Sequence, residues 1–221
     1  MIDLDLEEFY DRMRKPHDFV PKSSLASIQD YYDIFEKELQ EGNDVLYICM
    51  SGKFSSTLGA ANNARDMLLE EYPDRKVVVV DCNTISYGQH YITKVAKEMI
   101  DNNKTLDEVV EVIEDIKPSV HYFFTVESLN YLRDGGRIGG GAALLGEVLN
   151  IKPVLKIEDC HIDAVGKVRG RNKSLDAILD ELVKFMEGKN IDDYEFVLLE
   201  GDVPEEASEY KKEVLERLNL K

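Results

Sequence analysis

Val45-Leu-Tyr-Ile-Cys49 and Val77-Val-Val-Val-Asp81 are two short, almost uninterrupted apolar runs, and they decide the fold of this chain. Such runs are typical of strands that are buried on both faces, as in a parallel sheet covered by helices. A Gly/Ser-rich turn at residues 51–56 and a helix to about Glu71 are expected between them, and a further helix is expected to begin near Ser86. This order of strand, turn, helix and strand predicts a βαβ unit, and therefore an α/β/α domain on a parallel sheet.

Two capping boxes predict helix starts on either side of this unit. Ser27 is followed three residues later by Asp30, and Thr105 by Glu108. In each pair the first side chain accepts from a free amide of the first turn, while the acidic side chain reaches back to the cap residue. We expect Pro118 to close the second helix, because proline cannot continue a helical ladder.

After Pro118 the pattern changes to that of a second α/β domain with a mixed or antiparallel sheet. The segment 159–161 is expected to be a hairpin turn, which requires antiparallel neighbours. We therefore predict two domains, residues 1–117 and residues 118–221. The elements predicted for the second domain are strands at 120–125, 151–157, 161–169 and 195–200, and helices near 126–133, 142–149, 174–187 and 204–218.

The charge balance of the 221 residues excludes several classes of partner. With 27 basic and 44 acidic residues, the net charge is −17. A field of that sign repels nucleic-acid phosphates and anionic membrane surfaces. No apolar run approaches the roughly 18 residues that a membrane span needs, so no integral membrane segment is expected. An anionic ligand has to be held by local donors.

The three cysteines, Cys49, Cys82 and Cys160, favour free thiols over a metal site. No CxxC pair is present, and no histidine lies in a metal-binding spacing. Buried thiols in a reducing cytoplasm are the expected state. The acidic N-terminal residues do not resemble a signal peptide, which agrees with a cytoplasmic location. Neither a metal nor a cofactor is predicted.

The turn Ser51-Gly-Lys-Phe-Ser-Ser-Thr57 is the first candidate binding site. It follows a buried strand at the carboxyl edge of the predicted sheet, where ligands usually bind. Free amides at the start of the next helix and the hydroxyls of Ser51 and Ser55 suit an anion. Two alternatives stay open: an ordinary serine-rich loop, and a phosphate or nucleotide site of an enzyme. The motif GxxxxGK[ST] is absent, which counts against the enzyme.

Further candidate residues have structural alternatives. Taken singly, Ser23 and Ser24 are better explained as capping the following helix from outside, and Asp81 lies in a strand-end turn where it is a candidate cap for the helix after it. Gly135-Gly136-Arg137 begins a glycine-rich stretch that continues at 139–141, and it is either a flexible link or a point of close backbone approach.

A basic patch is predicted in the segment Lys167-Val-Arg169-Gly-Arg171. Alternate residues of a strand lie on one face, so Arg169 and Arg171 are expected side by side. The patch is either a partner surface or a set of ion pairs with the acidic helices.

Taken in order, these segments resemble the DegV family of bacterial fatty-acid-binding proteins. The family carries a TSQPS-like segment, an SSxLSGT-like loop and a V-x-D-S strand end, followed by LxYLxxGGRI, IKP and KxRG segments. Six motifs in the same order, from about Phe9 to the end of the chain, are specific. The matching segments here are 23–27, 51–57, 80–82, 129–138, 151–153 and 167–170.

The resemblance implies a fold of two α/β domains with a lipid tunnel between or beside them. It implies one bound long-chain fatty acid, whose carboxylate is presented to a separate fatty acid kinase that makes an acyl phosphate for phospholipid synthesis. The protein itself would be a carrier without catalytic residues. The carboxylate donors would be at Ser23, Ser24, Ser51, Gly52, Ser55 and Arg137, and the kinase-facing surface at Arg169 and Arg171.

The sequence also departs from the family pattern. Ser23 replaces a threonine, Gly52 a serine and Ser56 a glycine, so a left-handed backbone at Ser56 would be strained. The family's first strand is expected before Ile2, and its GxHTGPG segment after Lys221. On this basis, loss of lipid binding and assembly into a homo-oligomer are both open.

Overall fold

The computed structural model describes residues 5–15, 19–138 and 150–220. The chain forms two compact units, each of which is continuous in space but not in sequence. We call Ser23–Tyr122 with Ile157–His161 the parallel-sheet unit, and Met1–Lys22, Phe123–Lys156 and Ile162–Lys221 the hairpin unit. The predicted division of the sequence into domains 1–117 and 118–221 stays a prediction.

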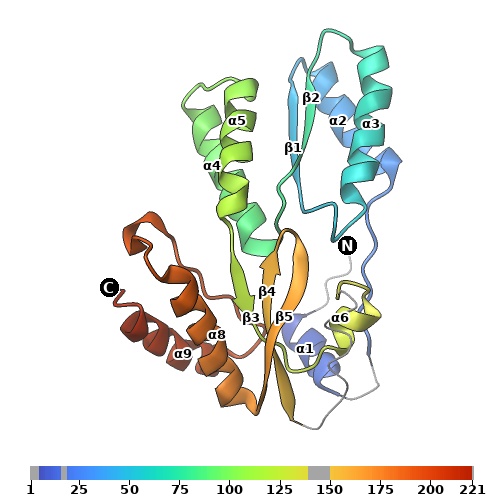
Figure 1. Cartoon of the computed structure of the whole chain (residues 1–221). Helices are drawn as coiled ribbons and strands as arrows, with labels where there is room; N and C mark the ends of the chain where they lie inside the picture. The colour runs from blue at the N-terminus through green and yellow to red at the C-terminus, as the bar shows by residue number, and fades with distance from the viewer. Residues whose placement is uncertain (1–4, 16–18, 139–149, 221) are drawn as a thin grey trace. The chain divides into compact units, whose positions relative to one another are not determined.

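The parallel-sheet unit contains the predicted βαβ unit. Strands β1 (Val45–Cys49) and β2 (Val77–Asp81) pair in parallel, with Val45 opposite Val77 and Cys49 opposite Asp81. Figure 1 shows α2 and α3 on one side of this pair, with α4 and α5 on the other. The elements are α2 (Ile28–Gln40), β1 (Val45–Cys49), α3 (Thr57–Glu71), β2 (Val77–Asp81), α4 (Ser86–Asp101), α5 (Leu106–Ile116) and the 3₁₀ turn η1 (Lys117–Ser119).

Alternate residues of the two strands enter two different cores. Tyr47 and Val77 pack with Phe35 of α2 and Leu68 of α3. Their strand neighbours pack on the opposite face, where Val80 meets the α4 and α5 residues Ile92, Ala96, Val109 and Ile113. Successive side chains of a strand point to opposite faces, so an apolar run without alternation is buried only when helices cover both.

Both predicted capping boxes are confirmed. The Ser27 hydroxyl accepts from the amide of Asp30 at 3.2 Å, and the Asp30 carboxylate accepts from the amide of Ser27 at 2.7 Å. Thr105 and Glu108 exchange the same pair of bonds at the start of α5. Local chemistry is therefore sufficient to define where these two helices begin.

Most of a three-stranded sheet in the order β3-β4-β5 lies in the hairpin unit, and β4 and β5 form an antiparallel hairpin whose tip, Ile157–His161, belongs to the parallel-sheet unit. Val154, Leu155 and Ile162 of the hairpin are buried, as are Ile178 and Leu179 of α8. The elements are α1 (Leu6–Arg14), β3 (Tyr122–Phe124), α6 (Asn130–Asp134), β4 (Ile151–Glu158), β5 (His161–Arg169), α8 (Arg171–Met186), η2 (Ile191–Asp193) and α9 (Pro204–Arg217).

Two predicted elements of this unit differ in the structure. The strand predicted at 195–200 is wrong, because this segment is not hydrogen-bonded into the described sheet, and Val197 and Leu199 are 42% and 51% exposed. A β-prone sequence becomes a strand only where a neighbouring strand supplies partners. The helix predicted at 126–133 is shorter, covering Asn130–Asp134. The helix predicted at 142–149 lies outside the described residues.

Candidate functional site

The loop 51–57 and the turn 81–84 leave neighbouring strands at the same edge of the parallel sheet. The amide of Ser51 donates to the carbonyl of Thr84 at 2.9 Å, and that of Cys82 to the carbonyl of Cys49 at 3.0 Å. The ladder between the strands thus continues for one step into the two connections. Because the strands are parallel, both connections lie at the carboxyl edge, the usual place for a ligand.

Asp81 ties these two connections together. Its Oδ2 accepts from the amide of Gly52 at 3.0 Å, and its Oδ1 from the amide of Asn83 at 2.8 Å. A β-carbon at residue 52 would lie 2.9 Å from Leu58 Cδ2 and 3.2 Å from Asp81 Oδ2, so a larger residue here requires both side chains to shift slightly. Asp81 lies in a strand-end turn, as the sequence suggested, but it does not cap α4. A left-handed residue at Asn83 (φ 53°) turns the chain, and Asp81 is used by the two connections instead.

The hydroxyls of the loop differ in how deeply they are buried. Ser51 is fully buried, and its Oγ accepts from the amide of Lys53 at 3.2 Å. Ser55 is half-buried and shares a 2.7 Å hydrogen bond with the hydroxyl of Thr57. An accepting hydroxyl keeps its proton to donate, so Ser51 still has a donor for an anion. Ser56 has a φ of −75°, and the strain expected at this position is not found.

Ser23 and Ser24 are exposed and lie in the segment that leads into α2. They do not cap this helix, because Ser27 fills that position. Beyond them the segment meets the start of α3 across a hollow of about 490 Å³. The residues that line it are Leu25, Ala26, Ser27 and Ile28 from this segment, and Ser56, Gly59, Ala60 and Asn63 from the loop and α3. The structure therefore brings the 23–28 segment beside the 51–57 loop.

The tip of the β4–β5 hairpin is a third component of this edge, and sequence analysis did not predict it. The ammonium of Lys53 donates to the carbonyl of Asp159 at 2.8 Å, and the thiol of Cys160 to the carbonyl of Asn83 at 2.9 Å. Lys53 and Asp159 are separated by 106 residues, and no local pattern in the sequence indicates such a contact.

All three cysteines are free and buried, as the sequence predicted. Burial, followed by the nearby Asp81 carboxylate, raises the pKa of the Cys49 thiol to about 12. Burial likewise raises the pKa of the Cys82 thiol to about 11. Both thiols are therefore protonated at neutral pH and are poor nucleophiles. Among the described residues, no group of three or more His, Cys, Asp or Glu side chains could hold a metal ion.

Arg137 belongs to the hairpin unit, as does the segment 130–137 that contains it. Its guanidinium donates to the carbonyl of Gly135, beside the left-handed turn at Gly136 (φ 72°). A contact between Arg137 and a ligand carboxylate stays a prediction. The glycines predicted to continue this stretch, at 139–141, lie outside the described residues.

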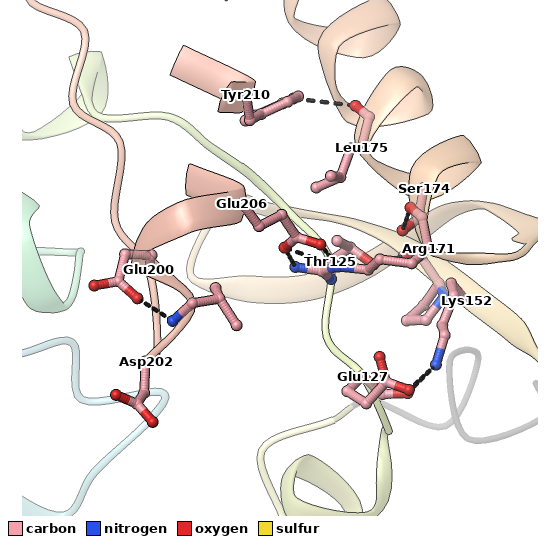
Figure 2. A network of polar contacts seen from close by, with 12 residues as sticks. Thr125, Glu127, Lys152, Arg171, Ser174, Leu175, Glu200, Asp202, Glu206 and Tyr210 are labelled. Carbon is pink, nitrogen blue, oxygen red and sulfur yellow. Dashed lines mark hydrogen bonds and ion pairs between the residues drawn. The ribbon is translucent and has the colours of Figure 1, made fainter. Parts of the chain in front are cut away.

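Arg169 and Arg171 do not share a strand face, so this part of the prediction is wrong. Arg169 is the exposed last residue of β5, whereas Arg171 is the first residue of α8. Gly170 lies between them with a φ of 94° and turns the chain out of the sheet. Figure 2 shows the Arg171 guanidinium paired with Glu206 of α9, where Nε lies 3.0 and 3.1 Å from the two carboxylate oxygens. For Arg171 the structure favours the intramolecular ion pair.

Lys152 in β4 is a polar residue of the hairpin unit for which sequence analysis predicted no role. It is 7% exposed, and its ammonium donates to the carbonyl of Glu127 at 3.0 Å and to the carboxylate of the same residue (Figure 2). A buried ammonium needs such partners, because desolvation without them is costly. The pair fixes the chain between β3 and α6 against β4.

Comparison with known proteins agrees with these observations. The family model described as "Uncharacterised protein, DegV family" matches residues 1–221. The chain belongs to the DegV family. A DegV domain-containing protein of Clostridium acetobutylicum is 35% identical over an alignment 221 residues long, which covers 99% of this chain and 75% of the relative.

Solved structures of several similar proteins have the same fold. A stearic-acid-binding protein from Eubacterium ventriosum has a TM-score of 0.85 and 30% identity, covering 100% of this chain and 75% of its own. A fatty-acid-binding DegV family protein from Thermus thermophilus has a TM-score of 0.70 and 32% identity, covering 84% and 64%. The B3 protein of the Streptococcus pneumoniae fatty acid kinase, loaded with linoleic acid, has a TM-score of 0.67 and 26% identity, covering 83% and 64%.

The helices within the described ranges were also compared with the length and apolarity of a membrane span. None of them is both long enough and apolar enough to cross a bilayer.

Proposed function

We propose that this DegV protein binds one long-chain fatty acid at the carboxyl edge of its parallel sheet and presents the carboxylate to a fatty acid kinase. The observation that carries the proposal is the 51–57 loop, which holds the hydroxyls of Ser51, Ser55 and Thr57 and whose Ser56 lines an apolar hollow at the start of α3. The similarity of the whole chain to the stearic-acid-binding protein from Eubacterium ventriosum supports the same conclusion. In this role the protein is a carrier and not an enzyme.

Two physical requirements of such a ligand agree with the site. An alkyl chain gains about 0.8 kcal/mol for each methylene that it buries, so the chain supplies most of the affinity. A carboxylate that leaves water needs hydrogen-bond donors or it protonates. In a protein of net charge −17 these donors have to be local, and the neutral hydroxyls of the loop meet this need.

Mass spectrometry of an organic extract from freshly purified protein tests the proposal. We expect about one equivalent of a long-chain fatty acid, with none in an extract of an unrelated acidic protein purified in parallel. A lipid-free protein that also fails to bind added long-chain acid would overturn the proposal. Nucleotide hydrolysis by such a protein would indicate a phosphate-binding enzyme.

Ser51→Ala and Ser23→Ala are each expected to weaken fatty-acid binding. Each removes one donor to an anion, which costs roughly 1.5–3 kcal/mol, or about 10- to 150-fold in Kd. Titration with a fluorescent fatty acid measures the loss, and Ser208→Ala on the exposed face of α9 is the control. If both variants bind like the parent, the carboxylate does not contact these serines.

Arg169→Glu is expected to reduce kinase-dependent formation of acyl phosphate while leaving fatty-acid binding intact. A cation near the transferring group would steer the kinase to the ligand, and charge reversal converts that attraction to repulsion. Lys211→Glu, an exposed charge reversal on α9, is the control. Loss of lipid binding in Arg169→Glu would place this residue in the ligand site, and an unchanged kinase rate would remove it from the partner surface.

A further inference from the structure

Three connections at the carboxyl edge of the parallel sheet form a closed set of contacts, which we call the edge junction. It consists of the loop 51–57, the turn 81–84 and the hairpin tip 159–160. The loop is bonded to the turn through Gly52 and Asp81, the loop to the tip through Lys53 and Asp159, and the tip back to the turn through Cys160 and Asn83. Each connection therefore contacts the other two.

The hairpin tip has a strained backbone that requires support from its surroundings. Asp159 and Cys160 both have positive φ angles, 47° and 60°. Two-residue hairpin turns with this geometry prefer Asn or Gly, so a cysteine there is unusual. Cys160 is nevertheless buried, at 7% exposed, and its thiol is directed to the carbonyl of Asn83. The contacts with the loop and the turn compensate for the strain in the tip.

Lys53 is exposed, but its ammonium has a defined partner in the hairpin tip. Its ammonium lies 2.8 Å from the Asp159 carbonyl, an oxygen that also lies 2.9 Å from Nδ1 of His161. The backbone amide of Lys53 donates to Ser51 Oγ, the buried hydroxyl of the loop. Lys53 thus joins the hairpin tip to the hydroxyl that is proposed to receive the carboxylate.

We infer that Lys53 and Cys160 are positioning residues, which hold the 51–57 loop in its ligand-binding shape by fastening it to the hairpin tip. The expected effect on ligand binding rests on the proposed fatty-acid site, whereas the expected ordering of the loop does not. Pre-ordering of a loop lowers the entropic cost that binding would otherwise include. Loss of either contact leaves the donors of the loop in place and makes them less ordered.

The test compares Lys53→Met, Cys160→Ala and the double variant with the parent. Alanine keeps a β-carbon, so Cys160→Ala removes the thiol contact without relieving the backbone strain. Lys97→Met is the matched control, because it removes an exposed lysine from α4 of the same unit that pairs only with Asp101 in the contacts described. Lys53→Arg and Cys160→Ser retain a donor at each position and are the rescue variants.

Two measurements are made on each variant. Hydrogen exchange on ligand-free protein is expected to be faster at the amides of 52–57 and 81–84 in both single variants, and unchanged in Lys97→Met. Fatty-acid Kd is expected to rise about 3- to 10-fold in each, because each variant loses one neutral or singly charged hydrogen bond. The two losses are expected to be less than additive, since both release the same tip, and the rescue variants should restore both readings.

Three results would be decisive against the inference. Unchanged exchange in both variants would show that the tip does not order the loop. A rise in Kd for Lys53→Met alone, with unchanged exchange, would make Lys53 a direct ligand contact. Fully additive losses would show that the two residues act separately. If the parent binds no fatty acid, the proposed function fails, whereas the exchange measurement still tests the edge junction.

Discussion

Removal of the Arg171–Glu206 ion pair tests whether Arg171 stabilises the hairpin unit or is available to a partner. We consider Arg171→Met, which keeps the long apolar side chain, together with Glu206→Gln and the double variant. The pair joins the first turn of α8 to the first turn of α9. Hydrogen bonding from Arg171 is the main reason that the pKa of Glu206 lies below its ordinary value.

The partial exposure of Arg171 and Glu206 places the expected coupling energy of the ion pair between two known limits. Exposed ion pairs contribute about 0–1 kcal/mol, whereas breaking a fully buried pair costs about 3–5 kcal/mol. The two side chains are 30% and 33% exposed, and two guanidinium nitrogens contact the two carboxylate oxygens, Nε to Oε2 at 3.0 Å and Nη2 to Oε1 at 2.5 Å. Part of the attraction is therefore screened by water, but the bidentate geometry retains a good share of it. We expect a coupling energy of about 1–2 kcal/mol.

A double-mutant cycle in urea, followed by circular dichroism at pH 7, gives this coupling energy directly. The pair Arg217–Asp180 is the internal control, because it joins the same two helices through one 2.6 Å contact and its carboxylate side chain is 65% exposed. Its coupling should be smaller. A coupling below about 0.5 kcal/mol for Arg171–Glu206, or one no larger than the control, would refute the reasoning.

The pH dependence gives an independent check. A carboxyl group whose pKa is lowered by folding stabilises the protein above its ordinary pKa, which is 4.5 for Glu206, and this stability is lost as the pH falls through the lower folded value. The coupling should therefore persist at neutral pH and decline below about pH 4.5. A coupling that grows on acidification would contradict the assignment.

Four further substitutions, two at glycines and two at the start of α5, have effects on stability that the structure predicts. Gly88→Ala should destabilise the parallel-sheet unit by about 1–3 kcal/mol, because the new β-carbon would lie 2.7 Å from the Tyr122 hydroxyl. A β-carbon at Gly59 would meet open space, so Gly59→Ala should stabilise the protein by about 0.5–1 kcal/mol through helix propensity. Equal shifts of Tm for the two glycine variants in thermal unfolding would contradict this contrast. Thr105→Ala should cost about 1 kcal/mol as a lost helix cap. Hydrogen bonds from Thr105 and Lys104 lower the pKa of Glu108 to about 2. The stabilisation by the Glu108 carboxylate is therefore present above pH 4.5 and lost as the pH falls toward 2. In Glu108→Gln the free energy of unfolding should depend less on pH over this range.

The parallel-sheet unit could be predicted because its signals are local. The two apolar runs 45–49 and 77–81 each need cover on both faces, and a turn and helix between them leave a parallel arrangement as the simple solution. The capping boxes at Ser27 and Thr105 depend on residues three positions apart. The loop at Ser51 follows directly from the strand before it, so its place at the carboxyl edge was also predictable.

Tertiary structure alone decided the contacts between residues that are distant in sequence. The apolar segment 195–200 has the composition of a strand, but it pairs with none of the strands in the described sheet. One left-handed glycine at 170 separates Arg171 from Arg169, and Glu206, 35 residues away, then becomes its partner. The contact of Lys53 with Asp159 spans 106 residues. Periodicity and capping depend on neighbours along the chain, whereas such contacts depend on how strands pair and where turns point, and these are set by the packing of the whole unit.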